Sequence, residues 1–256
     1  MTPESVPIVI DLPQFEEIEI YPIHDLHYGD ENFDAHRWNT VSQHILAEPN
    51  RMVVFCGDLF QMAIPNSKSS MHTQTHSVKE QQDFITEIFR TFKDRCLAIV
   101  DGNHEDRAFK ATGLYALFTP AVLAGLESRY RSAYAVVDLG FGADLVQPCR
   151  VVGFICHKAK DLKNFSSVDS LEGFDYMISG HDHEPRDHAR GHLCYDRQRR
   201  ELKIKSVEYI NGGSFLTYGG YGARAGYRPK SDKMYKLVVR NLGNRQKALV
   251  TVGFYV

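Results

Sequence analysis

Several features that would fix a simple functional class are missing from the sequence. No stretch approaches the ~18 consecutive apolar residues that a membrane-spanning helix needs, and residues 1–11 contain no basic segment of the kind that starts a secretory leader. The formal net charge is only −2, which argues against a protein coated with nucleic acid over its whole surface. We therefore expect no membrane partner, and positive charge only in local patches.

Cysteine is scarce, and its spacing excludes the common structural uses. The chain has 5 cysteines, an odd number, and no two of them form a CxxC pair: Cys56, Cys96, Cys149, Cys156 and Cys194. Three of them, Cys56, Cys96 and Cys156, lie in or beside apolar runs. We interpret the five as reduced core thiols of a cytoplasmic protein.

The sequence does contain enough apolar material for one large layered domain. Of its 256 residues, 43% are hydrophobic and 24% are charged, so a sizeable core can form. A single α/β domain of this length is ordinary, and we find neither an internal repeat nor a linker. We expect one domain over residues 1–256, with a β-rich portion over 186–256.

Apolar periodicity predicts strands that alternate with helices in the first hundred residues. The predicted strands cover 15–23, 52–56, 97–100, 133–139, 151–156, 176–179, 192–196, 202–210, 234–240 and 247–255. The predicted helices cover 34–48, 78–93 and 114–130, and residues 62–77 form an exposed polar loop. The initial β-α-β-α-β order indicates a largely parallel sheet with right-handed crossovers.

Polar side chains with metal or proton chemistry follow the predicted strands, at or next to a glycine or a turn. In residues 98–107 an apolar strand ends at Asp101-Gly102, and Asn103, His104 and Glu105 come next. Similar positions after other strands are occupied by Asp25, His27, Asp58, His157, His181 and His183. Strand ends of an α/β fold deliver such side chains to one edge of a sheet, so we expect them to meet.

This set of donors predicts a divalent metal centre. Carboxylate, imidazole and amide oxygen together suit Mn²⁺, Fe²⁺, Zn²⁺ or Ni²⁺, and the absence of cysteine argues against a structural zinc site. Residues 25 and 27, and likewise 181 and 183, point the same way from an extended strand end. Seven ligands suit two ions that share a carboxylate. We expect two manganese ions, with iron, zinc, nickel or magnesium as alternatives.

Five motifs within this set resemble, in order, the signature of the calcineurin-like metallophosphoesterases: Asp25-x-His27, Gly57-Asp58, Gly102-Asn103-His104-Glu105, His157 and Gly180-His181-x-His183. The resemblance covers residues 20–185, and residues 102–107 and 211–221 are also similar to bacterial and phage phosphoesterases. It implies an α/β fold, a four-layer α/β/β/α sandwich of two mixed sheets flanked by helices. The metal centre would lie at the sheet edges.

The resemblance also implies ligand roles, with Asp58 as the bridge between the metals. The first metal would take Asp25, His27 and His183, and the second Asn103, His157 and His181. One position departs from the family pattern, because Lys158 follows His157 where the family usually has glycine. His157 is nevertheless the only histidine between His104 and His181.

His104 matches the family histidine that contacts the scissile phosphate and protonates the leaving group. In this scheme a metal-activated hydroxide attacks phosphorus, and His104 assists the departing oxygen without binding metal. Either Asp101 or Glu105 could orient its other ring nitrogen.

Side chains outside the motifs offer cations and aromatic groups to a substrate. A basic rim could include Arg107, Lys158, Lys160, Lys163, Arg186 and Arg190, unless these are surface charges without a role. Residues 218–228 alternate tyrosine, glycine and arginine, so Tyr221 and Arg224 could stack on bases and bind phosphate. The alternative is a glycine-rich turn with packed tyrosines. His72 and His76 lie in the polar loop, where we expect them to be solvated.

These observations predict a cytoplasmic binuclear-metal phosphoesterase that hydrolyses a phosphodiester of a nucleotide or nucleic acid. A phosphomonoesterase or protein phosphatase is the first alternative. Asp101 argues against it, because it replaces an arginine of the Ser/Thr phosphatases and would repel a doubly charged monoester. A non-catalytic metal-binding scaffold is the second alternative, and the retention of His104 argues against it. The oligomeric state is left open.

Overall fold

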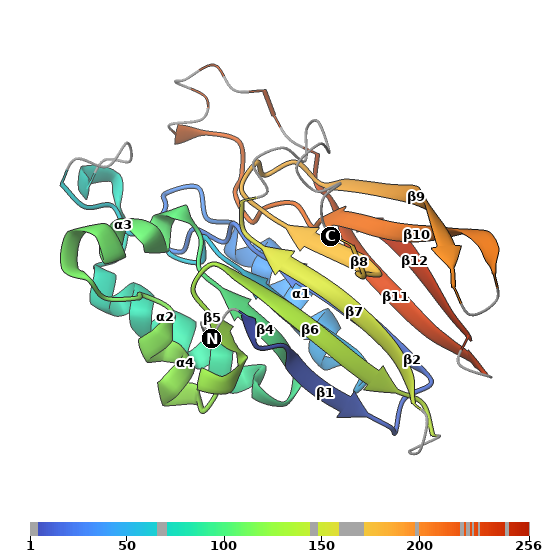
Figure 1. Cartoon of the computed structure of the whole chain (residues 1–256). Helices are drawn as coiled ribbons and strands as arrows, with labels where there is room; N and C mark the ends of the chain where they lie inside the picture. Colours follow the sequence, from blue (N-terminus) through green and yellow to red (C-terminus); the bar gives the residue numbers. More distant parts are fainter. Residues whose placement is uncertain are drawn as a thin grey trace.

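The computed structural model describes residues 5–65, 71–143, 148–158, 172–197, 200–220, 223, 226, 228–229, 231–243 and 246–255. In this part of the chain two mixed six-stranded sheets lie face to face, as Figure 1 shows. Helices lie against one of them. This arrangement confirms the predicted fold class, α/β with two mixed sheets and flanking helices.

Sheet A has the strand order β1-β6-β7-β8-β10-β9. Its strands are β1 (Ile8–Leu12), β6 (Tyr134–Phe141), β7 (Cys149–Cys156), β8 (Tyr176–Ser179), β9 (Arg186–Asp196) and β10 (Glu201–Asn211). The pairs β1–β6, β7–β8 and β8–β10 are parallel, whereas β6–β7 and β9–β10 are antiparallel. The parallel β7 and β8 therefore end on the same side of the sheet.

Sheet B has the strand order β12-β11-β2-β3-β4-β5. Its strands are β2 (Glu17–Ile23), β3 (Arg51–Cys56), β4 (Cys96–Val100), β5 (Tyr130–Arg131), β11 (Lys233–Gly243) and β12 (Gln246–Tyr255). Strands β2 to β5 are parallel, and β11 runs antiparallel to both of its neighbours. The predicted parallel β-α-β-α-β unit is thereby confirmed, with α1 (Ala35–Leu46) and α2 (Val78–Thr91) as its crossovers.

Alternation along the strands of sheet B separates two cores. On β3, Val53 and Phe55 face the helices, where they pack with Trp38 of α1 and Phe89 of α2. The intervening residues Met52 and Val54 face sheet A and pack with residues of β1, β6, β7 and β8. Because successive side chains of a strand point to opposite faces, one short apolar run supplies both cores.

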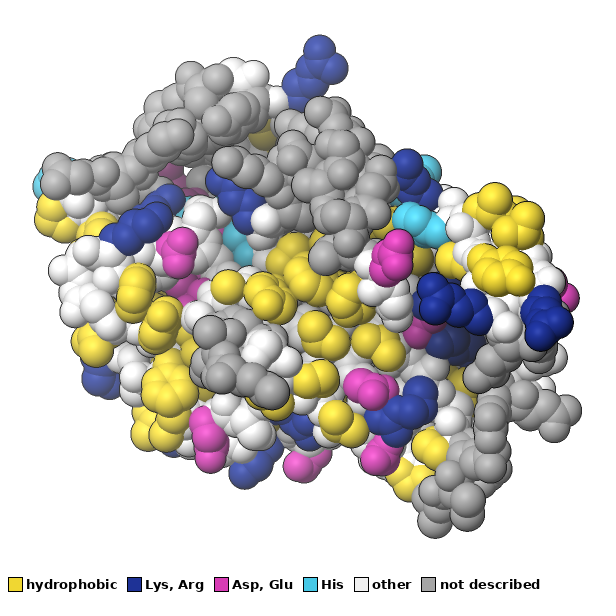
Figure 2. Space-filling view, viewed as in Figure 1, with side chains coloured by type: hydrophobic (Ala, Val, Ile, Leu, Met, Phe, Trp, Pro, Cys, Tyr) yellow, Lys and Arg dark blue, Asp and Glu magenta, His cyan; other side chains and the backbone are white. Residues whose placement is uncertain are grey.

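The outer face of sheet A is only partly covered by described residues. A small buried cluster of Cys156, Met177, Val207 and Tyr209 lies there, with Tyr134 and Phe154 packed against it. Figure 2 shows hydrophobic side chains gathered over this face. The described residues place no helix on it, so three of the four predicted layers are seen in them.

Two elements differ from the prediction between residues 103 and 130. A helix, α3 (Asn103–Thr112), follows the polar motif directly, and only the short α4 (Phe118–Ala124) forms within the predicted 114–130 helix. Glu105 and Asp106 favour the first turn of α3, and Gly113 and Gly125 end α3 and α4 in the left-handed conformation. Strand β1 was also not predicted.

Two expectations from the composition concern the cysteines and the lack of membrane-spanning helices. All five cysteines are free, four of them buried and Cys194 partly exposed. None of the helices in the described ranges is both long enough and apolar enough to cross a membrane.

Candidate metal centre

The seven predicted ligands come together where strands of both sheets end. Asp25 and His27 follow β2, Asp58 follows β3, and Asn103 follows β4, all in sheet B. His157 follows β7, and His181 and His183 follow β8, in sheet A. Six of these residues form groups whose ligand atoms lie within 4.8 Å of one another, and Asn103 lies beside one of the groups.

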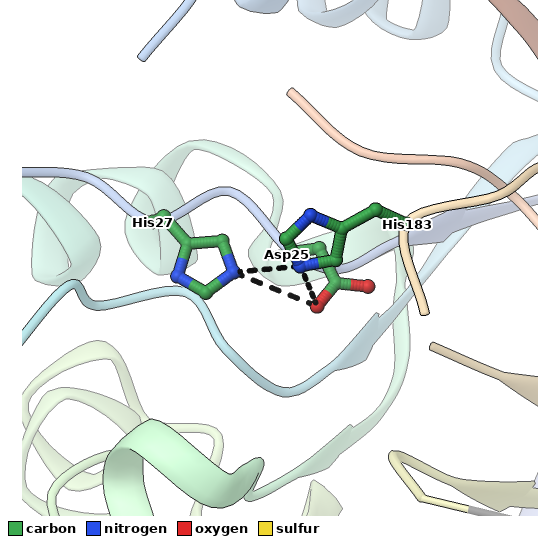
Figure 3. A group of neighbouring side chains, drawn as sticks. All are labelled: Asp25, His27 and His183. Carbon is green, nitrogen blue, oxygen red and sulfur yellow. Dashed lines mark hydrogen bonds and ion pairs between the residues drawn. The ribbon is translucent and has the colours of Figure 1, made fainter. Parts of the chain in front are cut away.

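The first group contains Asp25, His27 and His183 (Figure 3). The Nε2 atoms of His27 and His183 lie 3.2 Å apart. Oδ1 of Asp25 lies 3.7 Å from the first of these nitrogens and 3.4 Å from the second. Three donor atoms therefore converge on a common point.

The second group is built around Asp58, which is 1% exposed. Its Oδ2 lies 3.2 Å from Nε2 of His157, and that nitrogen also lies 3.3 Å from Oδ1 of Asn103. His181 completes the group. Oδ2 of Asp58 is 3.8 Å from Nε2 of His27 as well, so this carboxylate lies between the two groups.

The convergence of these atoms fits a cation. Oδ1 of Asp25 is buried and has no hydrogen-bond partner, although an unpaired buried polar atom is costly. In the second group Nδ1 of His157 donates to the carbonyl of Cys56, which leaves Nε2 facing two oxygen atoms. Oxygen and imidazole donors of this kind suit borderline or hard divalent ions. The buried Asp and His groups could therefore hold metal ions.

The pKa values of Asp25 and His157 are shifted because these groups lie close together. Burial alone would raise the pKa of Asp25, but His183 and His24 hold it well below its usual range. Burial alone would lower the pKa of His157, but the charge of Asp58 raises it to about 10. Both shifts show that the negative charges of the group attract positive charge.

The backbone is strained at most of the predicted ligands. Among the described residues seven non-glycine positions have positive φ, and five of the seven are predicted ligands: Asp25 (49°), His27 (48°), Asp58 (50°), His181 (81°) and His183 (58°). Left-handed conformations of such residues cost about 1–3 kcal/mol each and concentrate at functional sites.

Glu105 fixes the loop that carries Asp58. Its buried carboxylate accepts four backbone N–H groups, those of Asp58 and Gly102 at 2.8 Å each, Leu59 at 2.9 Å and Phe60 at 3.2 Å. Gly102 approaches so closely that a Cβ there would collide with the backbone nitrogen and Oδ1 of Asp58. The Gly-Asn-His-Glu motif thus joins the ends of β3 and β4.

His104 lies beside the centre but is oriented differently from the prediction. Its Nδ1 lies 2.7 Å from the carbonyl oxygen of Gln61, so a backbone carbonyl orients the ring where we expected the carboxylate of Asp101 or Glu105. Its Nε2 lies 3.9 Å from Oδ2 of Asp58 and accepts from Arg107 at 2.9 Å. Burial, followed by the charge of His27, lowers the pKa of His104 to about 3.

Asp101 also differs from its expected role. Its Oδ2 accepts a 2.5 Å hydrogen bond from the hydroxyl of Tyr130. Burial and the neighbouring Glu105 raise the pKa of Asp101 to about 8. The raised pKa weakens the repulsion of a doubly charged phosphomonoester that we expected from Asp101.

The predicted basic rim is only partly assembled in the described residues. Arg107 lies against His104, and the positive charge of Lys158 contributes to a lowered pKa of His181, after burial and His157. Arg186 is engaged in ion pairs with Asp182 and Glu184, both at 2.8 Å. Tyr221, Arg224, Lys160 and Lys163 lie outside the described residues.

Residues near the centre that the sequence reasoning did not assign are His24 and Gln61. Gln61 orients His104 through its backbone, which no side-chain pattern signals. His24 was visible as a histidine directly before Asp25, and it contacts the carboxylate of Asp25. The contact depends on the orientation of the Asp25 carboxylate, which the sequence does not show.

No protein-family model and no curated protein matches the chain. Similar solved structures include Vps29 of Chaetomium thermophilum, at 11% identity and a TM-score of 0.38, with 93% of this chain and 97% of that chain covered. Another is a metallophosphoesterase from Sphaerobacter thermophilus, at 12% identity and a TM-score of 0.36, with 93% and 88% covered. The latter bears the family name that the motifs predicted.

Proposed function

We propose that the chain is a binuclear metal-dependent phosphoesterase of the calcineurin-like type. One observation supports this proposal most strongly: residues of all five motifs, which follow strands of both sheets, meet around the buried Asp58. In addition, Oδ1 of Asp25 has no hydrogen bond. Asp25, His27 and His183 would hold one ion, Asn103, His157 and His181 the other, and Asp58 both.

In this proposal the chain's own residues position the phosphate and the leaving group. Bound divalent ions would supply Lewis acidity and lower the pKa of the attacking water. His104 also forms a group with His27 and Asp58 whose ligand atoms lie close together, but in this proposal both ions have their ligands without it. Arg107, in contact with His104, offers positive charge to a phosphate oxygen.

For the substrate we propose a phosphodiester of a nucleotide or nucleic acid, with Arg107 and Lys158 as cationic contacts. Tyr221 and Arg224 remain candidates for base and phosphate contacts. A phosphomonoester is the second candidate, because the carboxyl of Asp101 is bound to Tyr130 and its pKa is raised, so it repels a dianion less than an ordinary aspartate would.

Rates on bis- and mono-p-nitrophenyl phosphate with added Mn²⁺ test the proposal and the choice between these ester classes. We expect Mn²⁺-dependent hydrolysis that EDTA abolishes, and a faster rate on the diester. For the histidine substitution tested next, the exposed His36 on α1 provides a matched control, since His36→Ala should leave the rate unchanged. A purified, Mn²⁺-loaded protein that hydrolyses neither ester would favour the non-catalytic scaffold.

A second experiment tests His104. In the structure Nε2 of His104 accepts from Arg107 and the pKa of the ring is lowered, so proton donation requires that a bound phosphate draw Arg107 away and attract a proton to the ring. General acid catalysis contributes ~10²–10⁴-fold, so His104→Ala should then lower turnover by about that factor on an ester with an alkoxide leaving group. The loss should be smaller with p-nitrophenolate, which hardly needs a proton, and metal content should be unchanged. Loss of metal would make His104 a ligand, and an equal penalty for both leaving groups would indicate phosphate positioning instead.

A further inference from the structure

His24 is a fully buried histidine next to the metal centre, and none of the five motifs includes it. Its Nδ1 lies 2.7 Å from Oδ2 of Asp25. On the other side of the ring, the backbone N–H of Gly212 donates to Nε2 at 2.9 Å. Both ring nitrogens are therefore engaged, one with a predicted ligand and one with the segment after β10.

These two contacts define where the proton of the imidazole lies. A backbone N–H can only donate, so Nε2 of His24 must present its lone pair to Gly212. In a neutral imidazole the other nitrogen then carries the proton. Nδ1 of His24 is consequently the donor to the carboxylate of Asp25.

The two carboxylate oxygens of Asp25 therefore have different surroundings. Oδ2 accepts from His24 and from the backbone N–H of His181 at 2.8 Å. Oδ1 has no hydrogen bond and faces Nε2 of His27 and of His183. The carboxylate cannot rotate without breaking both bonds to Oδ2, so Oδ1 stays directed at the centre.

The segment that contacts His24 also joins the first and last motifs. The backbone N–H of Phe215 donates to the carbonyl of Asp25 at 3.1 Å. The side-chain amide of Asn211 donates to Oδ1 of Asp182, between His181 and His183, at 2.9 Å. At Gly180 a Cβ would lie only 3.0 Å from Cγ and Nδ1 of His24, so the ring is enclosed from this side too.

We propose that His24 is a positioning residue that sets the affinity of the centre for a divalent ion by holding the carboxylate of Asp25. The inference rests on the proposed metal centre and does not depend on what the centre hydrolyses. Residues that orient metal ligands from outside commonly change metal affinity by about 10–100-fold when they are replaced.

Two substitutions separate the contacts of His24. The amide nitrogen of asparagine lies as many bonds from Cα as Nδ1 of histidine, so His24→Asn can keep the donor to Asp25 and lose the bond to Gly212. The amide oxygen of glutamine lies as many bonds from Cα as Nε2, so His24→Gln can keep the acceptor for Gly212 and lose the donor to Asp25. A purely structural role would not favour asparagine.

Calorimetric titration of the full chain with Mn²⁺, after EDTA treatment, measures the effect. We expect His24→Gln to weaken Mn²⁺ binding by about 10–100-fold and His24→Asn to bind close to wild type, with His36→Gln as the control. Unchanged binding in His24→Gln, or an equal loss in both variants, would overturn the inference. Failure of the wild type to bind Mn²⁺ would overturn the centre itself, whereas binding without hydrolysis would refute only the proposed phosphoesterase activity.

A measurement on the unaltered chain keeps the inference testable if a variant does not fold. Nitrogen-15 NMR of labelled histidine distinguishes the two tautomers, and we expect His24 to be the Nδ1–H form in the EDTA-treated protein. An Nε2–H tautomer would be incompatible with donation to Asp25 and would overturn the inference.

Discussion

Replacement of Glu105 by glutamine tests how the loop after β3 is held. The carboxylate accepts two N–H groups on each oxygen, those of Leu59 and Phe60 on Oε1 and those of Asp58 and Gly102 on Oε2. Glutamine keeps one oxygen of similar position and puts an NH₂ group, which cannot accept, in place of the other. One pair of buried backbone donors must then face another donor.

The cost follows from the number of stranded donors. A buried donor left without a partner costs about 1–3 kcal/mol, so two cost about 2–6 kcal/mol. The free energy of unfolding of a typical domain is about 5–15 kcal/mol, and Glu105→Gln should therefore remove a large part of it. With a urea m-value of about 2 kcal/mol/M, the unfolding midpoint should fall by about 1–3 M.

Urea unfolding in EDTA measures this change without any contribution from metal. Glu87 on α2 is an exposed glutamate paired with Arg90, and Glu87→Gln should change stability by less than about 1 kcal/mol. A Glu105→Gln midpoint within the range of this control would refute the reasoning, because it would mean that the four backbone bonds contribute little.

Three further predictions concern the proposed metal centre and a partly buried carboxylate. Asp58→Asn should lose at least one ion and nearly all activity in metal analysis and rate assays, and undiminished metal and rate would exclude the bridging role. His157→Ala should weaken metal binding and cut activity by orders of magnitude, whereas Lys158→Ala should change mainly KM; activity within twofold for the former would show the assignment to be wrong. Burial alone would raise the pKa of Glu19, but Lys236 holds it below 4.5. The ionised Glu19 therefore contributes its full stabilisation at pH values above its ordinary pKa. This stabilisation is lost as the pH falls through the lowered pKa. Glu19→Gln should flatten this part of the acid-unfolding curve, and an unchanged slope below pH 4.5 would contradict the shift.

Much of the sheet architecture was predictable because the strands are short, strongly apolar and separated by clear turns. Strand β8 was predicted with the bounds it has, and α1 and α2 within two residues or so of their observed ends. Helix α3 was missed because its first turn is the polar motif itself, Asn103 to Asp106, which has no apolar periodicity. Its stability comes from Glu105 and from packing, which a periodicity argument does not see.

The sequence predicted that the seven candidate ligands lie together, but it did not predict how the side chains around them are oriented. Strand ends located the seven ligands, since parallel strands of an α/β fold end on one side. The orienting partner of His104 is a backbone carbonyl, that of Gln61, and carbonyls have no sequence signal. The turn of Asp101 toward Tyr130 was equally hidden, because these residues lie 29 positions apart and meet only through the pairing of β4 with β5.

The left-handed backbone at five of the predicted ligand positions makes the chain less stable than its core alone would allow. Glycine would relieve each of these conformations, yet it would remove the donor atom, so selection for stability and selection for the centre act in opposite directions at the same residues. An ion that binds only the folded chain returns stability in proportion to the logarithm of its concentration over its dissociation constant. With the proposed metal centre, the stability of the folded protein would therefore depend on the supply of divalent metal.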